Sequence, residues 1–506
     1  MAETATRRGG RAAAIDQMPF APPVNRDRPT EPLTEAGIAA LHDGAMRILE
    51  EIGIAFPHQE ALAALRAAGG RVAGERVRMG RDFVMEMLAR APSEFTLTPR
   101  NPDHRISLGG DTMLFGNVAS PPNCWDMETG RKRAATRDDC ANLLRLTQFF
   151  NCIHFVGGYP VEPADIPAGL RHLEVLHDGL TLTDKVMHAY SLGRARVEEA
   201  MEMVRIAGGL SEAAFEASPR MFSNINSSTP LRYDHATIDG CLPLVRRGQA
   251  VVVTPLTLAG ATAPAMLAGA VAQSLAEALG AIALFQALRP GAPCVIGTFT
   301  SNVDPRSGAP VFGTPEQLRA TQMTGQMARF YGLPLRASGV CSANVPDGQA
   351  MWETAQSLWA AVQSGSHMVY HAAGWLEGGL IASPEKFIMD CEVLQQIQHY
   401  MQPQICATGP AEIALDTVRV LGTTGRLPGL SPERQGDGVY RPILSDWRGY
   451  EDWQRGGGLW TAERAHLLFR EILADFAPPP MDAAIREELG DFVARRRRAH
   501  AAPADA

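Results

Sequence analysis

The stretch HMVYHAA at residues 367–373 decides the fold, because it is the last of eight apolar runs that each precede a helical segment. The runs are typical of strands, since they are short and bounded by glycine, proline or polar residues. The seven earlier runs are TMLFGNV (112–118), CIHFVGG (152–158), KVMHAYS (185–191), MFSNINS (221–227), AVVVTPL (250–256), CVIGTFT (294–300) and LRASGVC (335–341).

A segment with helical spacing follows each run. These segments are expected at 137–149, 167–179, 194–208, 234–247, within the alanine-rich stretch 259–288, and at 314–331, 348–364 and 384–400. Eight strand–helix units with strands too apolar to face water predict an α/β fold, the closed (β/α)8 TIM barrel. An open doubly wound sheet is the alternative, but no GxGxxG closes an early strand and an open sheet does not require eight units.

The composition divides the chain into four parts. Residues 1–30, rich in proline and arginine, are expected to form a flexible arm without an apolar segment of signal-peptide length. Residues 31–110 are expected to form an N-terminal helical module, since apolar residues recur at helical spacing. The barrel is expected over 111–402, and 403–506 should form a C-terminal loop and a helical cap.

The charge of the chain limits the classes of molecule it is expected to bind, and its cysteine content indicates the redox environment. The formal net charge is -8, which gives no electrostatic support for nucleic-acid binding, and Arg495–Arg498 is interpreted as a solvated helix end. The apolar stretch 259–288 contains Gln273, Ser274 and Glu277, which favours a buried helix over a membrane span. The eight cysteines are scattered without a CxxC pair, so reduced thiols and a cytoplasmic location are expected.

Reacting groups of a TIM barrel lie at the carboxyl ends of its strands, so the strand assignment gives a shortlist of site residues. Most of its members are neutral amides, hydroxyls and aromatic residues. No phosphate-binding loop, paired-carboxylate signature or closely spaced zinc motif is present, and no metal is expected. The shortlist contains Asn117, Tyr159, His188, Tyr190, Asn224, Asn226, Thr254, Thr300, Asn302, Ser342, His371, Trp375 and Glu377.

Aromatic residues near the barrel mouth suggest a cation site, because a quaternary ammonium ion is bound by ring faces and not by hydrogen-bond acceptors. Taken singly, each ring is more often a packing residue, but their predicted places in loops favour a pocket lined by two or three of them. The candidates are Trp125, Tyr159, Tyr190, Trp352, Tyr370, Trp375, Trp447, Tyr450 and Trp453.

Two residues of the last unit admit two interpretations each. His371 is either a satisfied core histidine or a donor aimed into the mouth, and its place at the end of the eighth strand favours the donor. Glu377 precedes two glycines, which either make a turn or allow the backbone to approach a ligand, and we favour the second. Ser383 in SPEK should cap the following helix.

Four separated stretches resemble the trimethylamine methyltransferase family over residues 30 to 490. They are HAAGWLEGGLIASPEKFIMD (371–390), NINSSTPLRYD (224–234), GVCSANVPDGQAMWE (339–353) and RPILSDWRGYEDW (441–453). The resemblance implies a (β/α)8 barrel that passes a methyl group from a methylamine to the cob(I)alamin of a separate corrinoid protein. Because the chain contains only standard residues, it resembles the non-pyrrolysine branch, which implies a quaternary amine such as glycine betaine or carnitine.

The resemblance also implies site residues. His371 matches the histidine that closes strand eight in the family pattern and, with Glu377, is expected to be catalytic. Tyr159, Tyr190, Trp375 and Trp352 are expected to hold the ammonium group, and Asn224 and Asn226, with His371, the carboxylate.

The partners follow from the same resemblance. Cobalamin is expected to come from the corrinoid protein, with no tightly bound cofactor in this chain, no nucleic-acid or membrane partner, and a homo-oligomeric state. Transfer of the methyl group to tetrahydrofolate and non-catalytic betaine binding are the alternatives.

Overall fold

The computed structural model describes residues 15–426 and 439–501 and contains a closed parallel barrel. The last strand pairs with the first, and Phe155 bridges Gly116 on one side and Val186 on the other. This closure confirms the predicted barrel and excludes the open sheet. The paired strands are β6 (Leu114–Asn117), β9 (Met187–His188), β10 (Met221–Ile225), β11 (Ala250–Val253), β13 (Cys294–Gly297), β16 (Leu335–Ser338) and β17 (Met368–Ala373).

The second of the eight strands is much shorter than the predicted run 152–158. Only Phe155 pairs with both neighbours, because the Asn117 side chain then accepts the Gly157 N–H at 2.6 Å in place of a backbone carbonyl. A side chain at Gly116 would lie 2.1 Å from the Phe155 ring, so a glycine is required there.

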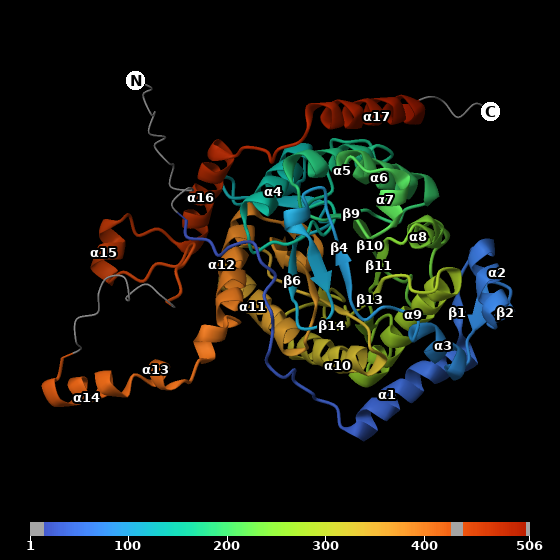
Figure 1. Cartoon of the computed structure of the whole chain (residues 1–506), viewed down its shortest axis with the longest axis horizontal. Helices are drawn as coiled ribbons and strands as arrows, with labels where there is room; N and C mark the ends of the chain where they lie inside the picture. Colours follow the sequence, from blue (N-terminus) through green and yellow to red (C-terminus); the bar gives the residue numbers. More distant parts are fainter. Residues whose placement is uncertain (1–14, 427–438, 502–506) are drawn as a thin grey trace.

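Eight helices surround the barrel in chain order (Figure 1). The fifth begins at Leu267, well inside the expected stretch 259–288, because Leu258–Ala259 forms a short strand, β12. Ser383 caps the last helix as expected, since its Oγ accepts the Lys386 N–H at 3.1 Å. The eight are α4 (Arg137–Phe149), α5 (Arg171–Leu182), α6 (Arg194–Ala207), α8 (His235–Arg246), α9 (Leu267–Leu288), α10 (Pro315–Tyr331), α11 (Gly348–Gln363) and α12 (Pro384–Tyr400).

Helix α9 is long and apolar enough to cross a membrane by length and composition, but 83% of its most apolar window is buried inside the protein. Its polar residues have structural partners. Gln273 donates to Glu277 at 3.0 Å, and Glu277 accepts the Leu231 N–H at 2.8 Å. These contacts are those of a core helix, as the sequence predicted.

A hairpin closes the amino end of the barrel. It consists of β4 (Phe95–Leu97) and β5 (Ile106–Leu108), and its apolar side chains join an interior cluster with Phe155, Phe222 and Met368. At the carboxyl end, short sheets extend from the loops instead, including the antiparallel pair β7 (Asn123–Asp126) and β8 (Arg131–Ala134). The amino end is therefore filled by side chains, and the carboxyl end is left for a site.

The N-terminal module contains strands as well as the expected helices. Helices α1 (Glu35–Arg47), α2 (Gln59–Ala68) and α3 (Arg81–Leu88) are joined by a three-stranded antiparallel sheet of β1 (Ile54–Ala55), β2 (Arg71–Ala73) and β3 (Arg76–Arg78). Val72 of β2 pairs with Val77 of β3 across a turn at Gly74. In each strand the valine lies between two residues whose side chains point to the other face, which is the two-residue period of a strand and not the period of a helix.

The expected arm is described only from residue 15, and residues 1–14 lie outside the described part of the chain. The described part lies against the barrel. The Asn25 N–H donates to the Asp111 carbonyl at 2.8 Å, and the Thr30 N–H donates to the Gln363 carbonyl at 2.7 Å.

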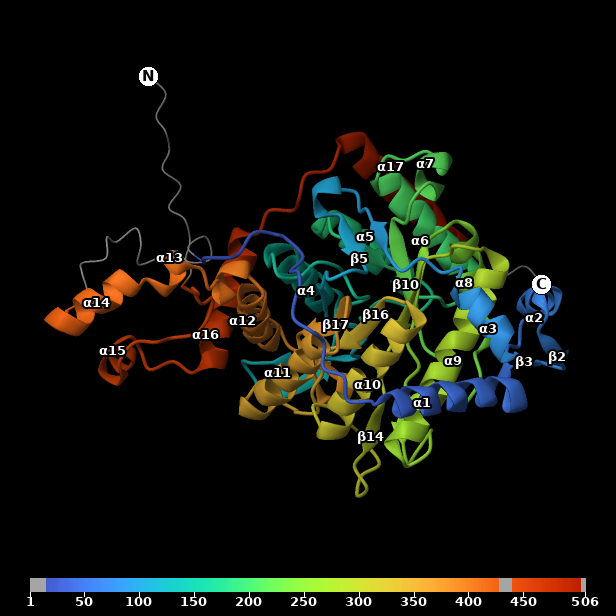
Figure 2. The same cartoon turned by 60° about the horizontal axis from the view of Figure 1, so that its bottom comes forward.

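The described residues of the C-terminal part form five α-helices after α12, and Figures 1 and 2 show where they lie relative to the barrel. Helix α16 packs on α12, α17 lies along α5 and α6, and α14 projects away from the barrel in both views. Their bounds are α13 (Pro410–Ile413), α14 (Leu415–Thr424), α15 (Tyr450–Arg455), α16 (Thr461–Asp475) and α17 (Ala483–Ala501).

The interpretation of Arg495–Arg498 as a solvated helix end is wrong for two of the four residues. Arg496 donates to Glu199 at 2.6 Å, and Arg497 pairs with Glu174. Both glutamates are buried on α6 and α5, and a buried carboxylate requires a positive partner or hydrogen bonds. The basic run therefore attaches α17 to the barrel.

Candidate functional site

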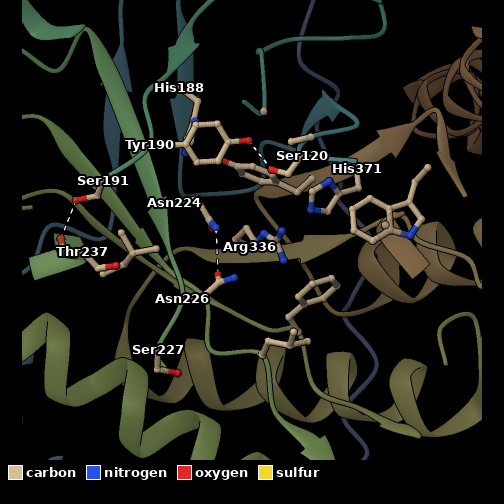
Figure 3. Close-up of a pocket in the computed structure, with 18 of the residues that line it drawn as sticks. Ser120, His188, Tyr190, Ser191, Asn224, Asn226, Ser227, Thr237, Arg336 and His371 are labelled. Atoms are coloured by element: carbon tan, nitrogen blue, oxygen red, sulfur yellow. Dashed lines mark hydrogen bonds between the residues drawn. The ribbon is translucent and has the colours of Figure 1, made fainter. Parts of the chain in front are cut away.

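A cavity of about 450 Å³ opens at the carboxyl ends of the barrel strands (Figure 3). Its lining comes from many separate strand–helix connections, as expected for an active site of this fold. The side chains that matter below are Ser120, His188, Tyr190, Asn224, Asn226, Phe299, Phe312, Arg336, Tyr370, His371 and Trp375.

Arg336 supplies the positive charge of the cavity. It lies on β16, is only 1% exposed, and donates to Ser338 Oγ at 2.7 Å. Burial lowers the pKa of Arg336 to about 10, so the guanidinium remains charged at neutral pH. Within the described residues it forms no ion pair with an acidic side chain, and its Nε has no hydrogen-bond partner. A buried, charged and incompletely bonded donor is suited to an anionic ligand group.

The two histidines of the cavity are neutral. Burial lowers the pKa of His188 to about 3. Burial also lowers the pKa of His371 well below its usual value, and the positive charge of Arg336 adds to that shift. His371 Nδ1 is buried without a hydrogen-bond partner. The histidines therefore offer polar edges without adding positive charge.

Aromatic rings form one wall. The ring of Trp375 lies 4.1 Å from that of His371 and 6.3 Å from that of Phe299, measured between centroids. Phe299 stacks on Phe312 at 5.1 Å. The guanidinium carbon of Arg336 lies 4.5 Å from the Tyr370 ring centroid, so the rings extend to the positive group. Such a wall suits a cationic or apolar ligand group.

Amide and hydroxyl groups form the opposite wall. Thr254 donates to Asn224 Oδ1 at 2.8 Å, and Asn224 Nδ2 lies 3.4 Å from Asn226 Oδ1. The Tyr190 hydroxyl is 2.5 Å from Ser120 Oγ. Figure 3 shows Arg336 pointing into the space between the two asparagines and His371. The cavity therefore has a polar side and an aromatic side, with one buried guanidinium between them.

Among the described lining residues, the acidic side chain is Asp234, which is exposed and caps α8 by accepting the Thr237 N–H at 2.8 Å. The interior of the cavity therefore carries a net positive charge. A ligand that is only a cation would be repelled, whereas a zwitterion would satisfy both Arg336 and the rings.

The backbone of the eighth strand places His371 in the cavity. Its register against β6 shifts between Val369 and Ala373, and His371 itself has φ +55°. A non-glycine residue in this region is strained, and such strain persists only where the surroundings enforce it.

Of the eight residues expected to be catalytic or to bind the substrate, five line this cavity: His371, Trp375, Tyr190, Asn224 and Asn226. His188 of the strand-end shortlist and Tyr370 of the aromatic candidates line it as well. The other three of the eight are elsewhere. Tyr159 packs edge-on against Tyr190, with centroids 4.5 Å apart. Trp352 is 57% exposed on α11, and Glu377 binds Lys132 Nζ at 2.8 Å beside the lining glycines 378 and 379.

Sequence reasoning missed Arg336, Phe299, Phe312 and Ser120. Arg336 was overlooked because the shortlist took only strand ends, whereas this side chain starts near the beginning of β16 and reaches the cavity. The available signal was a charged residue within an otherwise apolar strand, which must have a buried partner or a ligand.

One group of possible metal ligands lies outside the cavity. Side-chain atoms of His172, Glu199 and His500 lie within 4.8 Å of one another between α17 and the barrel helices. Arg496 already donates to Glu199 there, which neutralises the carboxylate without a metal. No other such group occurs in residues 15–426 and 439–501.

Comparisons with known proteins agree with this geometry. The family model described as trimethylamine methyltransferase (MTTB) matches residues 2–501. A glycine betaine methyltransferase of Desulfitobacterium hafniense is 36% identical over 467 residues, covering 92% of this chain and 96% of that protein. A proline betaine:corrinoid methyltransferase of Eubacterium limosum is 26% identical, covering 81% and 86%.

A solved structure shares the fold. The monomethylamine methyltransferase MtmB of Methanosarcina barkeri superposes with a TM-score of 0.53 at 10% identity, covering 91% of this chain and 88% of that one. At this identity the likeness supports the barrel and says nothing of the substrate.

Proposed function

This chain belongs to the trimethylamine methyltransferase family, and from that premise we propose that it demethylates a carboxylated quaternary amine of the glycine betaine class, with the cob(I)alamin of a separate corrinoid protein as methyl acceptor. The observation that carries the substrate class is Arg336, a buried guanidinium without an acidic partner in the described residues, in a cavity partly walled by rings.

The two halves of a betaine match the two sides of the cavity. The rings of Trp375, Phe299 and Phe312 offer faces to the permanently charged nitrogen, which accepts no hydrogen bond. Arg336 offers its guanidinium to the carboxylate. Trimethylamine and choline lack that carboxylate and would leave Arg336 uncompensated.

The chemistry requires no acid. When a methyl group leaves a quaternary nitrogen, the N–CH3 electron pair stays on nitrogen, and glycine betaine becomes dimethylglycine. The cobalt of cob(I)alamin supplies the nucleophile that takes the methyl group. Neutral His188 and His371 are consistent with this scheme, because the leaving amine needs no proton to depart.

The residues then have separate tasks. We assign carboxylate binding to Arg336 with His371, Asn224 and Asn226. We assign ammonium binding to Trp375, Phe299 and Phe312, together with Tyr190. Tyr159 supports Tyr190 from behind. Holding the nitrogen against the rings would orient one N–CH3 bond for in-line attack, which is the main contribution available to the protein.

The rim of the cavity suits a protein partner. Leu192, which lines the cavity, is 49% exposed, and Leu380, next to lining Gly379, is 50% exposed. Apolar side chains exposed at a cavity mouth are typical of a docking surface. We place the corrinoid protein there, with Glu377 and Lys132 at the edge of the contact.

The assay follows methylcob(III)alamin formation spectrally with free cob(I)alamin and a panel of glycine betaine, proline betaine, carnitine, choline and trimethylamine. The carboxylated amines should be substrates, and choline and trimethylamine should not. Turnover of choline or trimethylamine, without turnover of any carboxylated amine, would contradict the proposed substrate class. A parallel set with tetrahydrofolate as acceptor, and calorimetry without acceptor, identifies the alternative methyltransferase and the non-catalytic binder.

We further propose that the protein is a homo-oligomer and that it is located in the cytoplasm. Leu415, Val418 and Leu421 are exposed along α14, which projects from the barrel (Figure 2). A ten-residue helix is marginal in water without a partner, so burial against a second copy would stabilise it. Light scattering of the wild type and of a Leu415→Ser, Val418→Ser variant measures this assembly.

A further inference from the structure

A fully buried ion pair lies on α12, outside the cavity. Lys386 and Asp390 are one helical turn apart, both are 0% exposed, and the Lys386 ammonium contacts Asp390 Oδ1. The same ammonium donates to Thr354 Oγ1 of α11 at 2.9 Å. Both residues belong to the motif at 371–390, and nothing in the proposed chemistry uses them.

The second carboxylate oxygen of Asp390 reaches the active-site backbone. Asp390 Oδ2 accepts the Gly374 N–H at 2.8 Å. Gly374 lies between His371 and Trp375, which both line the cavity. The contact therefore links the ion pair to the segment that carries two of the proposed substrate-binding side chains.

That segment is strained. His371 has φ +55°, Gly374 +95° and Glu377 +48°, and the strand register shifts within it. Non-glycine residues with positive φ are strained, so fixed contacts from the surrounding structure must hold His371 and Glu377 in place. The Gly374 N–H bond to Asp390 is such a contact, since it comes from a rigid helix of the scaffold.

An ion pair is a costly way to pack this space. Desolvating two charges costs free energy, and well-packed apolar residues are often as stable or more stable. Burial raises the pKa of Asp390, and the Lys386 ammonium opposes that shift. The contact with the Lys386 ammonium favours the ionised form of Asp390, and an ionised carboxylate is a stronger acceptor for the Gly374 N–H than a neutral one.

We propose that Asp390 is a positioning residue, which fixes the strained 371–377 segment through the Gly374 N–H and so holds His371 and Trp375 against the substrate, with Lys386 as its counter-ion. This role rests on the proposed betaine site.

Two double variants isolate the hydrogen bond. Lys386→Met with Asp390→Asn removes both charges but keeps a side-chain oxygen for the Gly374 N–H. Lys386→Met with Asp390→Leu removes both charges and the acceptor. The two proteins differ at one side chain of similar size, and neither leaves an unpaired charge, so both are expected to fold.

The expected results differ between the variants. The Asp390→Leu protein should lose about 10- to 100-fold in kcat/KM for betaine demethylation, mainly through a higher KM, because small displacements of binding groups cost this much. The Asp390→Asn protein should stay within about threefold of the wild type. Hydrogen exchange at residues 371–380 should accelerate only in the Asp390→Leu protein.

Equal losses in the two variants, or unchanged exchange at 371–380 in both, would overturn the positioning role and leave the pair as packing. The exchange measurement needs no substrate, so it still decides the inference if no betaine is turned over. Absence of wild-type turnover with every betaine would instead count against the proposed function.

Discussion

Replacing Arg336 by methionine tests the substrate class most directly. Removing one partner of a buried charged hydrogen-bond pair costs about 2–5 kcal/mol, so betaine affinity should fall by roughly 30- to 4,000-fold. A cation without a carboxylate should gain instead. Two unit charges about 7 Å apart at an effective dielectric constant of about 20 repel by about 2.4 kcal/mol, and methionine removes this repulsion.

The assay is calorimetric titration with glycine betaine and with choline, without cobalamin. The ratio of the two affinities should change by about three orders of magnitude or more in the variant. Stability serves as the control. Arg336 is a buried charge without an acidic partner in the described residues, so its removal should leave the melting temperature unchanged or raise it. Arg336→Lys keeps the charge and should retain the preference for betaine with reduced affinity.

A parallel loss of affinity for betaine and choline, together with a lower melting temperature, would refute the reasoning. Arg336 would then support the barrel interior through Ser338 and the Tyr370 ring without contacting a carboxylate.

The remaining predictions concern the other groups of the site. His371→Ala should weaken betaine binding, by calorimetry, far more than it lowers the melting temperature, and equal loss of both would make His371 a core residue. Trp375→Leu should weaken glycine betaine binding by about 1–2 kcal/mol but binding of its carbon isostere 3,3-dimethylbutanoate, which keeps the carboxylate and lacks the cation, by less, because only the cation gains from the ring face; equal losses would exclude a cation–π contribution. Betaine affinity should be constant between about pH 6 and 9, because the pKa of His188 is about 3 and that of His371 is also lowered. Above about pH 10, deprotonation of Arg336 removes the positive charge and affinity should fall, whereas a change near pH 6.5 would indicate a titrating histidine. Glu377→Gln should leave betaine affinity within about twofold, since its carboxylate binds half-exposed Lys132, and a pair of this kind contributes about 0–1 kcal/mol; a loss above about tenfold would place Glu377 in the substrate site.

The barrel could be predicted from the sequence because its signal is local and repeated. Each strand is buried on both faces and is therefore an apolar run, and each helix has a period of 3.6 residues and a cap such as Ser383. Because the strand–helix unit repeats eight times, the number of strands can be counted from the sequence even though one strand pairs with each of its neighbours only through Phe155. The hairpin at Gly74 was missed because its strands have only three residues each, too few for a clear alternation.

The site was only partly predictable. Strand ends gave His371, Tyr190, Asn224 and Asn226, because parallel strands bring their carboxyl ends to one edge. Trp352 was included for its residue type, but the orientation of an exposed helical side chain depends on packing that no local pattern encodes. Predicting Arg336 requires knowing how far its side chain reaches from the start of its strand into the barrel, which the sequence does not reveal.

The sequence by itself determined the barrel, its order of units and the edge where the chemistry lies, because hydrophobic periodicity and strand count are properties of neighbouring residues. The tertiary structure alone decided which side chains share the cavity, that Arg336 is its buried charge, and that Asp390 reaches Gly374. These features depend on distances between residues that are far apart in the chain. They also depend on burial, because an exposed charge is hydrated by water, whereas a buried charge such as that of Arg336 needs a partner, which a ligand can supply.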